Sequence, residues 1–491
     1  MNVVDLILFQ CRYQPAVAAI CVPGADLDLI SYGRLERFIH NISRNALAHG
    51  LARGDVVALS FDDRILHAAF ILGLSRLGIA TLSTHDLHLP RQFKTDAVIS
   101  DAPRPVPNAG RFIQAGTDWT EGDDLPLEQK HVDRSGGNQL CRISMTSGTT
   151  GDASPCGFSH DMLIRRIGRY SWVYGNKAAD CSRIFIDPGI STYIGFTFFL
   201  YALAKGGTVF FRGDEATETM QALGLYKVQY MVAAPAALAQ FVELYEQAPG
   251  FPAGLEAILS LGSLLSKSLS ERIRARLCAN LFSSYGATEV PNIATAPAHT
   301  IADVPGAVGY VTPATSVEIV NDRGDAVAPG QEGTIRVRSE LALDGYLGDP
   351  IETAKTFRDG CFYPGDIGTL STDGLLTISG RETAVLNLGG DKVNPERIEQ
   401  VLTSFPGIAK AAVFSISNAM GIEELHAAIV APSFDESALR VHCTRHLAPK
   451  FVPQHFRAMP DIRVNHMGKI DRKWVAEIAR QQSPTTAAHL R

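Results

Sequence analysis

The sequence has almost no charge bias and no long apolar run. Its 491 residues carry 45 Lys and Arg against 51 Asp and Glu, a formal net charge of −6. No overall positive field would therefore draw the chain to nucleic acid or to an anionic membrane. The longest apolar run beyond the N-terminus, 196–204, ends at Lys205 and is far shorter than the roughly 18 residues of a membrane-spanning helix. With 46% hydrophobic and 20% charged residues, the composition excludes a disordered or collagen-like chain.

The cysteines lack the spacing of a metal site. No two of them form a C-x-x-C pair, and no Cys/His cluster has the spacing of zinc ligands. We expect no secretory signal either, because Asp5 stands where such a signal carries Lys or Arg. We expect a cytoplasmic protein with no nucleic-acid or membrane partner, whose cysteines are free thiols in a reducing compartment. The eight are Cys11, Cys21, Cys141, Cys156, Cys181, Cys278, Cys361 and Cys443.

Strand-like and helical patterns alternate through about the first 350 residues. The β-rich run 56–61 is followed by a helical run over 65–78 and by another β-rich run at 79–83. The same alternation returns at 230–234, which leads into a helix that starts at Pro235. Strands separated by amphipathic helices predict an α/β fold with layered, largely parallel sheets.

The pattern changes twice in the rest of the chain. From 305 to 380, strands separated by turn signals predict a β-rich subdomain. Beyond Gly380 we expect a compact α+β unit of about 110 residues. Its predicted elements are a helix from Pro395 to about Leu402, strands at 411–417 and 425–432, a helix near 436–447 and a terminal helix after Asp471.

A stretch rich in glycine and hydroxyl residues, SMTSGTTGD, spans 144–152. Gly148 and Gly151 allow sharp turns in which successive backbone N–H groups form an anion-binding nest. No Lys follows Gly151, so the stretch is not a P-loop. Taken alone it could also be a flexible surface loop. The hydroxyl groups available to phosphate oxygens are those of Thr146, Ser147, Thr149 and Thr150.

A second motif, SSYGATE, spans 283–289. The Tyr285 ring can lie against a planar group while the backbone passes closely behind it at Gly286. Glu289 supplies a hard oxygen ligand of the kind that Mg²⁺ takes up beside water and phosphate. Both dipeptides are common, so this heptad by itself identifies no site.

Two further motifs contain charged residues next to turns. In YPGDIGTL, 363–370, Asp366 is the type of carboxylate that accepts hydrogen bonds from both hydroxyls of a ribose, and Arg381 follows at the junction of the two predicted units. In VNHMGKIDR, 464–472, a turn at Gly468 holds out Lys469, a mobile cation suited to a reacting phosphate. Taken singly, each is better explained as a solvated or structural charge.

The order of these motifs identifies a family. TSGTTG, YGATE, GD, GR, the loop GGDKVNP and finally GKIDR follow one another in a chain that resembles the adenylate-forming superfamily from its first helix to Arg472. That superfamily includes acyl-CoA synthetases, the adenylation domains of peptide synthetases, and luciferases. The resemblance implies a large N-terminal AMP-binding domain, 1–381, of layered α/β sheets with a β-rich subdomain. It also implies a small mobile α+β lid domain, 382–491, joined by a hinge just after Arg381.

The resemblance further implies the roles of the matching residues. Tyr285 would stack on adenine, with Gly262 and Ser263 on the other side of the base, Asp366 and Arg381 would hold the ribose, and Ser284 and Gly286 would line the nucleotide. Thr288 would contact the α-phosphate, Glu289 would bind Mg²⁺, and Lys469 would bridge the substrate carboxylate and the α-phosphate. After the lid rotates, Gly389 and Gly390 would line the thiol channel. The β- and γ-phosphates would be held by Thr146, Ser147, Gly148, Thr149, Thr150 and Gly151.

Three positions depart from the family pattern. The lysine that usually follows the phosphate loop is replaced by Ser154, which could weaken ATP binding or slow turnover. Pro364 stands at the Thr of the usual T-G-D, and Thr383 occupies the hinge position that is commonly Asp or Lys. None of these changes removes a residue that the chemistry most needs.

The resemblance also implies a substrate pocket, whose lining residues are matched to this chain by their spacing. Relatives that activate amino acids place an Asp near the position of Tyr193, where it pairs with the substrate ammonium. A tyrosine cannot supply that charge, and burying an unpaired ammonium is costly, so the mostly apolar lining favours an aryl or a short- to medium-chain aliphatic acid. The predicted lining residues are Tyr193, Ile194, Thr197, Ala233, Leu259, Leu261, Ser284, Asn292 and Ile293.

The leading functional prediction is a carboxylic acid–CoA ligase. It would use ATP, Mg²⁺ and CoA, act on a small-molecule carboxylic acid, and exist as a monomer or homodimer. One alternative is a stand-alone enzyme that loads the phosphopantetheine of a separate carrier protein. Another is a non-catalytic, nucleotide-binding regulatory relative, motivated by the missing lysine at Ser154. A luciferase-type oxidase has no distinguishing residue in its favour.

Overall fold

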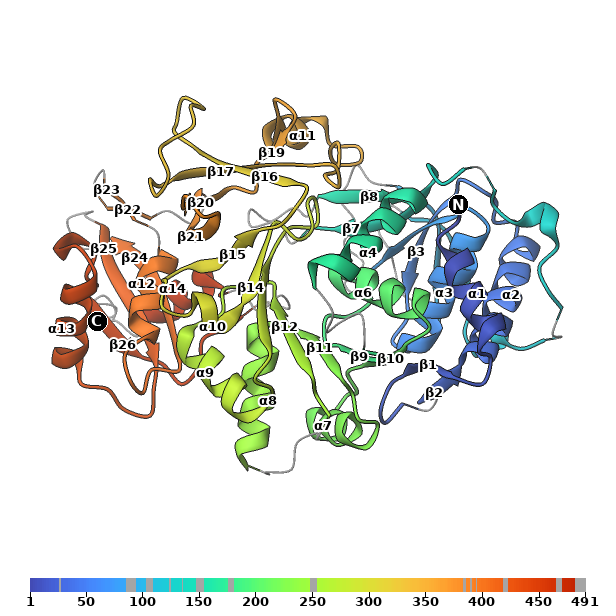
Figure 1. Cartoon of the computed structure of the whole chain (residues 1–491), viewed down its shortest axis with the longest axis horizontal. Coiled ribbons are helices and arrows are strands. Elements are labelled where there is room, and N and C mark those ends of the chain that lie inside the picture. The colour runs from blue at the N-terminus through green and yellow to red at the C-terminus, as the bar shows by residue number, and fades with distance from the viewer. Residues whose placement is uncertain are drawn as a thin grey trace, which may run out of the picture.

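The computed structural model describes residues 1–25, 28–84, 94–102, 109–122, 125–134, 136–146, 154–174, 181–247, 254–382, 386–388, 391–393, 395–417, 423–464 and 470–481. Elements from the start of the chain gather at one end of the molecule and elements from its end at the other, with the middle of the chain between them (Figure 1). No helix in these segments is both long and apolar enough to cross a membrane.

A six-stranded sheet forms one layer of the α/β region. Its order is β6-β5-β3-β4-β7-β8, and all neighbours are parallel except β7 and β8, which form an antiparallel pair. Asp63 caps the helix between β3 and β4, because its carboxylate accepts the backbone N–H groups of Ile65 and Leu66. The elements are β3 (Val56–Ser60), α3 (Arg64–Arg76), β4 (Ala80–Ser83), β5 (Thr95–Ser100), β6 (Ala109–Gln114), β7 (Leu140–Met145) and β8 (Pro155–Ser159).

A second sheet, of 15 strands among the described residues, combines both modes of pairing. Strands β1, β10, β9, β11, β12 and β13 pair in parallel in that order, and β14 continues the sheet antiparallel to β13. The predicted β-rich subdomain is present, but it extends the parallel sheet rather than forming one of its own. The first ten of these strands are β1 (Ala18–Cys21), β2 (Leu29–Ser31), β9 (Arg183–Ile186), β10 (Thr208–Phe211), β11 (Tyr230–Ala233), β12 (Ala257–Leu261), β13 (Leu281–Tyr285), β14 (Ala294–Pro297), β15 (Ala307–Val311) and β16 (Thr315–Val320). The others are β17 (Gly333–Ser339), β18 (Phe357–Arg358), β19 (Cys361–Phe362), β20 (Asp366–Leu370) and β21 (Leu375–Arg381).

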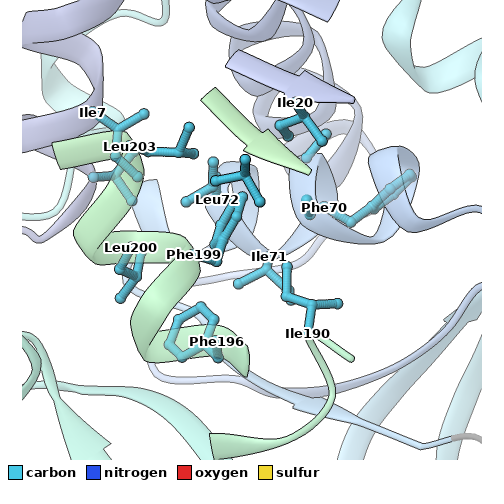
Figure 2. Packing of buried hydrophobic residues seen from close by; sticks show 14 of the residues in the cluster. Ile7, Ile20, Phe70, Ile71, Leu72, Ile190, Phe196, Phe199, Leu200 and Leu203 are labelled. Carbon is cyan, nitrogen blue, oxygen red and sulfur yellow. The ribbon is translucent and has the colours of Figure 1, made fainter. Parts of the chain in front are cut away.

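The largest apolar core surrounds one helix, α6 (Tyr193–Ala204). This helix contains the apolar run 196–204, and it is hydrophobic all round because it is enclosed on all sides. Figure 2 shows Phe196, Phe199 and Leu203 of this helix packed among side chains of α1, β1 and α3. The other helices of this region are α1 (Val4–Tyr13), α2 (Tyr32–Ala48), α4 (His160–Val173), α7 (Ala216–Leu225), α8 (Pro235–Gln247), α9 (Lys267–Arg276), α10 (Ala298–Ile301) and α11 (Pro350–Thr356).

The C-terminal elements form a separate sheet, β24-β25-β26, which follows the last strand of the large sheet in the chain. Val413 and Leu425 on one face pack with α12 and α13, and Phe414 and Ala428 on the other face pack with α14. The α+β arrangement predicted beyond Gly380 is confirmed, with the strand expected at 425–432 running two residues earlier. The elements are β22 (Leu386–Leu388), β23 (Asp391–Val393), α12 (Pro395–Thr403), β24 (Lys410–Ser417), β25 (Glu423–Val430), α13 (Glu436–His446), β26 (His455–Ala458) and α14 (Arg472–Gln481).

All eight cysteines are buried free thiols, as their spacing predicted. Burial disfavours the thiolate, and it raises the pKa of Cys141 to about 12. Such a thiol is an apolar packing group rather than a nucleophile or a metal ligand.

Candidate active site

The carboxyl ends of two parallel strands bring Gly262 beside the motif at 283–289. Strand β12 pairs with β13 so that Leu261 lies opposite Ser284, and the chain then continues into Gly262 on one strand and Tyr285 on the other. Ligands of open α/β sheets bind at this edge of the strands. Gly262 has φ +93° and open space where a side chain would stand. At Gly286 a Cβ atom would come within 2.7 Å of the backbone nitrogen of Asn292, so the tight turn excludes any larger residue.

The glycine- and hydroxyl-rich stretch connects β7 to β8. Its two ends are joined, because the Thr146 N–H donates to the Ser154 carbonyl over 2.9 Å and the Ser154 N–H donates to the Thr146 hydroxyl over 3.0 Å. The Thr146 hydroxyl thus closes the base of the loop in addition to its predicted contact with phosphate. The remaining members of the predicted phosphate site lie outside the described residues; these are Ser147, Gly148, Thr149, Thr150 and Gly151.

The predicted adenine and ribose residues form one hydrogen-bonded group. The Tyr285 hydroxyl donates to one Asp366 oxygen over 2.5 Å, and Arg381 Nε lies 2.9 Å from the other. Asp366 and Arg381 face each other across the antiparallel pair β20 and β21, which fixes their register. Burial, followed by the Asp366 charge, raises the pKa of Tyr285 well above its ordinary value, so the phenol stays protonated and donates. The Asp366 charge also raises the pKa of Arg381 against the effect of burial.

The Thr288–Glu289 segment is held on two sides. The Tyr346 hydroxyl donates to Glu289 Oε1 over 2.5 Å, which orients a carboxylate that is only 7% exposed. On the backbone side, the Arg166 guanidinium donates to the carbonyls of both Thr288 and Glu289. Burial and the adjacent Glu289 charge raise the pKa of Tyr346, so its hydroxyl remains a donor at any physiological pH. The carboxylate that the sequence singles out is therefore preorganised.

Four of the predicted pocket residues share one core cluster, and two others lie elsewhere. Tyr193, Leu259 and Leu261 belong to the cluster around α6, and Ile194 packs against it. Ala233, by contrast, faces the separate cluster beneath α8 and α9. Ile293 packs into the core of the β-rich region. The predicted lining residues are thus divided among three apolar clusters.

The polar members of the predicted pocket contact one another or their neighbours. The Tyr174 hydroxyl lies 3.1 Å from Ser284 Oγ. Thr197 is fully buried and its hydroxyl already bonds the Tyr170 hydroxyl at 2.8 Å and the Tyr193 carbonyl at 3.0 Å, so it stabilises the helix start. Asn292 has a left-handed backbone, φ +53°, and its buried Nδ2 has no hydrogen-bond partner among the described residues. Buried amide donors are nearly always paired, so this one is available to a water molecule or a ligand.

Comparison with known proteins identifies the family. The model of the AMP-binding enzyme family matches residues 10–347, and that of the AMP-binding enzyme C-terminal domain matches residues 397–469. The chain belongs to the AMP-binding enzyme family. It is an AMP-forming ligase.

Relatives resemble this enzyme over nearly its whole length. The 2-succinylbenzoate–CoA ligase of Bacillus licheniformis is 26% identical over 86% of this chain and 89% of its own. The feruloyl-CoA synthase of Amycolatopsis sp is 25% identical over 94% of this chain and 96% of its own. The structure of an amide bond synthetase from Marinactinospora thermotolerans superposes with a TM-score of 0.80 at 22% identity, covering 97% of this chain and 99% of that one. This likeness shows a shared fold.

The donor set of the enzyme suits a magnesium nucleotide. Glu289 offers a buried, oriented carboxylate oxygen, which is the ligand type that Mg²⁺ prefers. The Thr288 side chain precedes it, half-buried, at the end of the same segment. These residues therefore fit a magnesium ion that keeps its other positions for phosphate and water. Lys469, Gly389 and Gly390 lie outside the described residues.

Sequence reasoning missed two residues that hold this site. Tyr346 contacts Glu289 from 57 positions away, and Arg166 contacts the Thr288–Glu289 segment from more than 120 positions away. Both lie in segments with no unusual composition. For Arg166, a basic helical run, RRIGR at 165–169, is typical of a solvated helix face. The only sign in the sequence that Arg166 is buried is the set of apolar residues that flank this run. They favour a helix that packs against other elements on more than one side.

Proposed function

We propose that this enzyme activates a carboxylic acid with ATP as an acyl-adenylate and then transfers the acyl group to the thiol of coenzyme A. The observation that carries the proposal is a set of three groups, two of them in or directly after strands of the 15-stranded sheet and the third in the six-stranded sheet. These are the Tyr285–Asp366–Arg381 group, the oriented carboxylate of Glu289 and the hairpin closed by Thr146. Together they match the three parts of a nucleotide triphosphate, namely base and ribose, metal-bound α-phosphate, and terminal phosphates.

For adenylation the protein has to position the carboxylate and ATP and to neutralise the negative charge between them. A carboxylate and a polyphosphate repel each other, and negative charge grows on the α-phosphate oxygens as pyrophosphate leaves. Mg²⁺ held by Glu289 would supply part of the compensating charge. Lys469 would supply the rest from the C-terminal unit, between the attacking carboxylate and the α-phosphate. Thr288 would donate to the same phosphate, and Asp366 would fix the ribose.

The second step requires the C-terminal unit to move. Arg381 is the last residue of the large sheet, and the domain boundary proposed from the sequence lies directly after it. We propose that residues 382–491 rotate about this boundary once the adenylate has formed. Lys469 would then leave the site, and Gly389 and Gly390 would line the path of the incoming thiol. The closed arrangements would also shield the mixed anhydride from water.

The charge around Tyr193 argues against a positively charged acyl group. The Arg166 guanidinium lies 5.0 Å from the Tyr193 ring centre, so this side of the pocket carries positive rather than negative charge. A substrate ammonium placed here would meet a cation. The Phe158 ring, stacked on Tyr193, adds apolar surface. We therefore propose an aryl or a short- to medium-chain aliphatic acid and not an α-amino acid.

The test is a panel of carboxylic acids assayed for ATP–pyrophosphate exchange, with CoA, a phosphopantetheinylated carrier protein and a simple amine then offered to the acids that react. Exchange with an aryl or aliphatic acid, followed by thioester formation with CoA, is the expected result. Transfer to the carrier protein alone supports the stand-alone adenylation enzyme, and transfer to the amine alone supports an amide-forming enzyme. Nucleotide binding without exchange for any acid supports the regulatory relative and overturns the proposal.

A further inference from the structure

Arg166 is a buried cation without an acidic partner in the described part of the chain. Its side chain is fully buried in α4, and all three guanidinium nitrogens donate to backbone carbonyls. Nη1 donates to the Thr288 carbonyl over 2.8 Å and Nη2 to the Glu289 carbonyl over 2.7 Å. Nη2 and Nε also donate to the Leu341 carbonyl, over 2.6 and 3.2 Å. A rigid fork with five N–H donors can satisfy three carbonyls at once, and a lysine cannot.

Two aromatic rings hold the guanidinium in this orientation. It lies 4.9 Å from the centre of the Phe158 ring and 5.0 Å from that of Tyr193. The two rings are themselves stacked, with centres 5.0 Å apart. Stacking of this kind compensates a desolvated arginine and restricts its rotation. Since Tyr193 begins the helix predicted to line the acyl pocket, Arg166 stands between that helix and the Thr288–Glu289 segment.

We propose that Arg166 is a positioning residue for adenylation, which fixes the Thr288–Glu289 backbone so that Thr288 meets the α-phosphate and Glu289 meets Mg²⁺. The inference rests on the proposed function. The proposal follows from which carbonyls the Arg166 guanidinium binds. Two of them are consecutive, and they belong to Thr288 and Glu289 themselves. Tyr346 fixes the Glu289 carboxylate, while Arg166 fixes the backbone that carries it. Both residues would therefore act through the Thr288–Glu289 segment.

The neighbouring arginine on the same helix provides a matched control. Arg169 is also buried, at 3% exposure, and its Nη2 donates to the Thr312 and Thr315 hydroxyls and the Pro313 carbonyl. It therefore attaches α4 to the β-rich region without contacting residues 288 or 289. If the role of Arg166 were purely structural, replacing either arginine would have the same effect on stability and on exchange kinetics.

The experiment compares Arg166→Lys with Arg169→Lys in four measurements. These are the thermal midpoint, calorimetric binding of MgATP, and kcat and KM for pyrophosphate exchange as free Mg²⁺ is varied. Both variants are expected to lower the midpoint. Only Arg166→Lys should weaken MgATP binding, raise the Mg²⁺ concentration for half-maximal exchange and lower kcat. The expected loss in kcat is roughly 10- to 100-fold, as is typical when a residue that supports a metal ligand is replaced. The acid KM should change much less than kcat.

Equal kinetic effects of the two variants, or an unchanged Mg²⁺ requirement in Arg166→Lys, would overturn the proposal. If Arg166→Lys does not fold, Phe158→Leu removes one of the two rings that orient the guanidinium. It should shift MgATP binding and the Mg²⁺ requirement in the same direction by less, and no shift in a folded Phe158→Leu enzyme overturns the role. If the wild-type enzyme activates no acid, the proposed function fails, and the contrast between Arg166→Lys and Arg169→Lys in MgATP binding still decides the positioning role.

Discussion

Removing a single hydroxyl group tests whether the Glu289 carboxylate is the magnesium ligand. In Tyr346→Phe the ring keeps its contact with Phe357, at 5.5 Å between centres, but the donor 2.5 Å from Glu289 Oε1 is lost. A hydrogen bond to a charged, buried acceptor contributes about 1.5–3 kcal/mol. If this hydrogen bond holds the carboxylate in the geometry that Mg²⁺ requires, its loss should lower the metal affinity or kcat by roughly 10- to 100-fold.

The assay is the initial rate of ATP–pyrophosphate exchange as a function of free Mg²⁺, with the thermal midpoint measured on the same preparations. We expect Tyr346→Phe to raise the half-saturating Mg²⁺ concentration and to recover part of its rate at high Mg²⁺. Glu289→Gln should lose more and recover less, because the charge itself is gone. Tyr310→Phe, at an exposed position of β15, should behave as the wild type. A Tyr346→Phe enzyme with lowered stability but an unchanged Mg²⁺ profile would refute the reasoning.

Three further predictions follow from the same arrangement. Ser154→Lys keeps both backbone hydrogen bonds to Thr146 and adds a cation beside the phosphate loop. A gain of about 1.4 kcal/mol in ATP binding would lower the KM for ATP by ~10-fold. An unchanged or higher KM contradicts the placement of Ser154. Lys469→Ala should abolish pyrophosphate exchange and largely spare thioester formation from supplied acyl-adenylate, whereas equal loss of both half-reactions contradicts a role confined to adenylation. Burial lowers the pKa of His160 to about 4 in the folded enzyme, where its Nδ1 accepts the Val3 N–H. In the unfolded chain the pKa of a histidine is near 6.5. Between these two pH values the unfolded chain therefore binds more protons than the folded enzyme. Stability should therefore be complete above about pH 6.5 and fall by on the order of 3 kcal/mol as the pH drops toward 4; urea unfolding should show a weaker fall for His160→Gln, and parallel profiles contradict the assignment.

The sequence alone determined the local structure and the motifs. Hydrophobic periodicity and helix caps are properties of neighbouring residues, so α3 and α12 start and end within about two residues of the predictions, and α8 starts at the predicted Pro235. The chemistry of the site was also visible locally, since Tyr285, Glu289 and Asp366 each lie beside glycines or strand ends. The order of these motifs was enough to identify the superfamily and, with it, the type of reaction.

Only the tertiary structure decided which face each strand residue presents and which distant residues support the site. Alternation along β11 places Val232 and Ala233 on opposite faces, but pattern alone does not say which face meets α6 and which meets α8. Arg166 and Tyr346 carry no local signature, because their partners are carbonyls and a carboxylate brought near by folding from 122 and 57 positions away. A cation in a basic helical run is indistinguishable in sequence from a solvated one. Its burial depends on the apolar rings and carbonyl oxygens that the rest of the fold assembles around it.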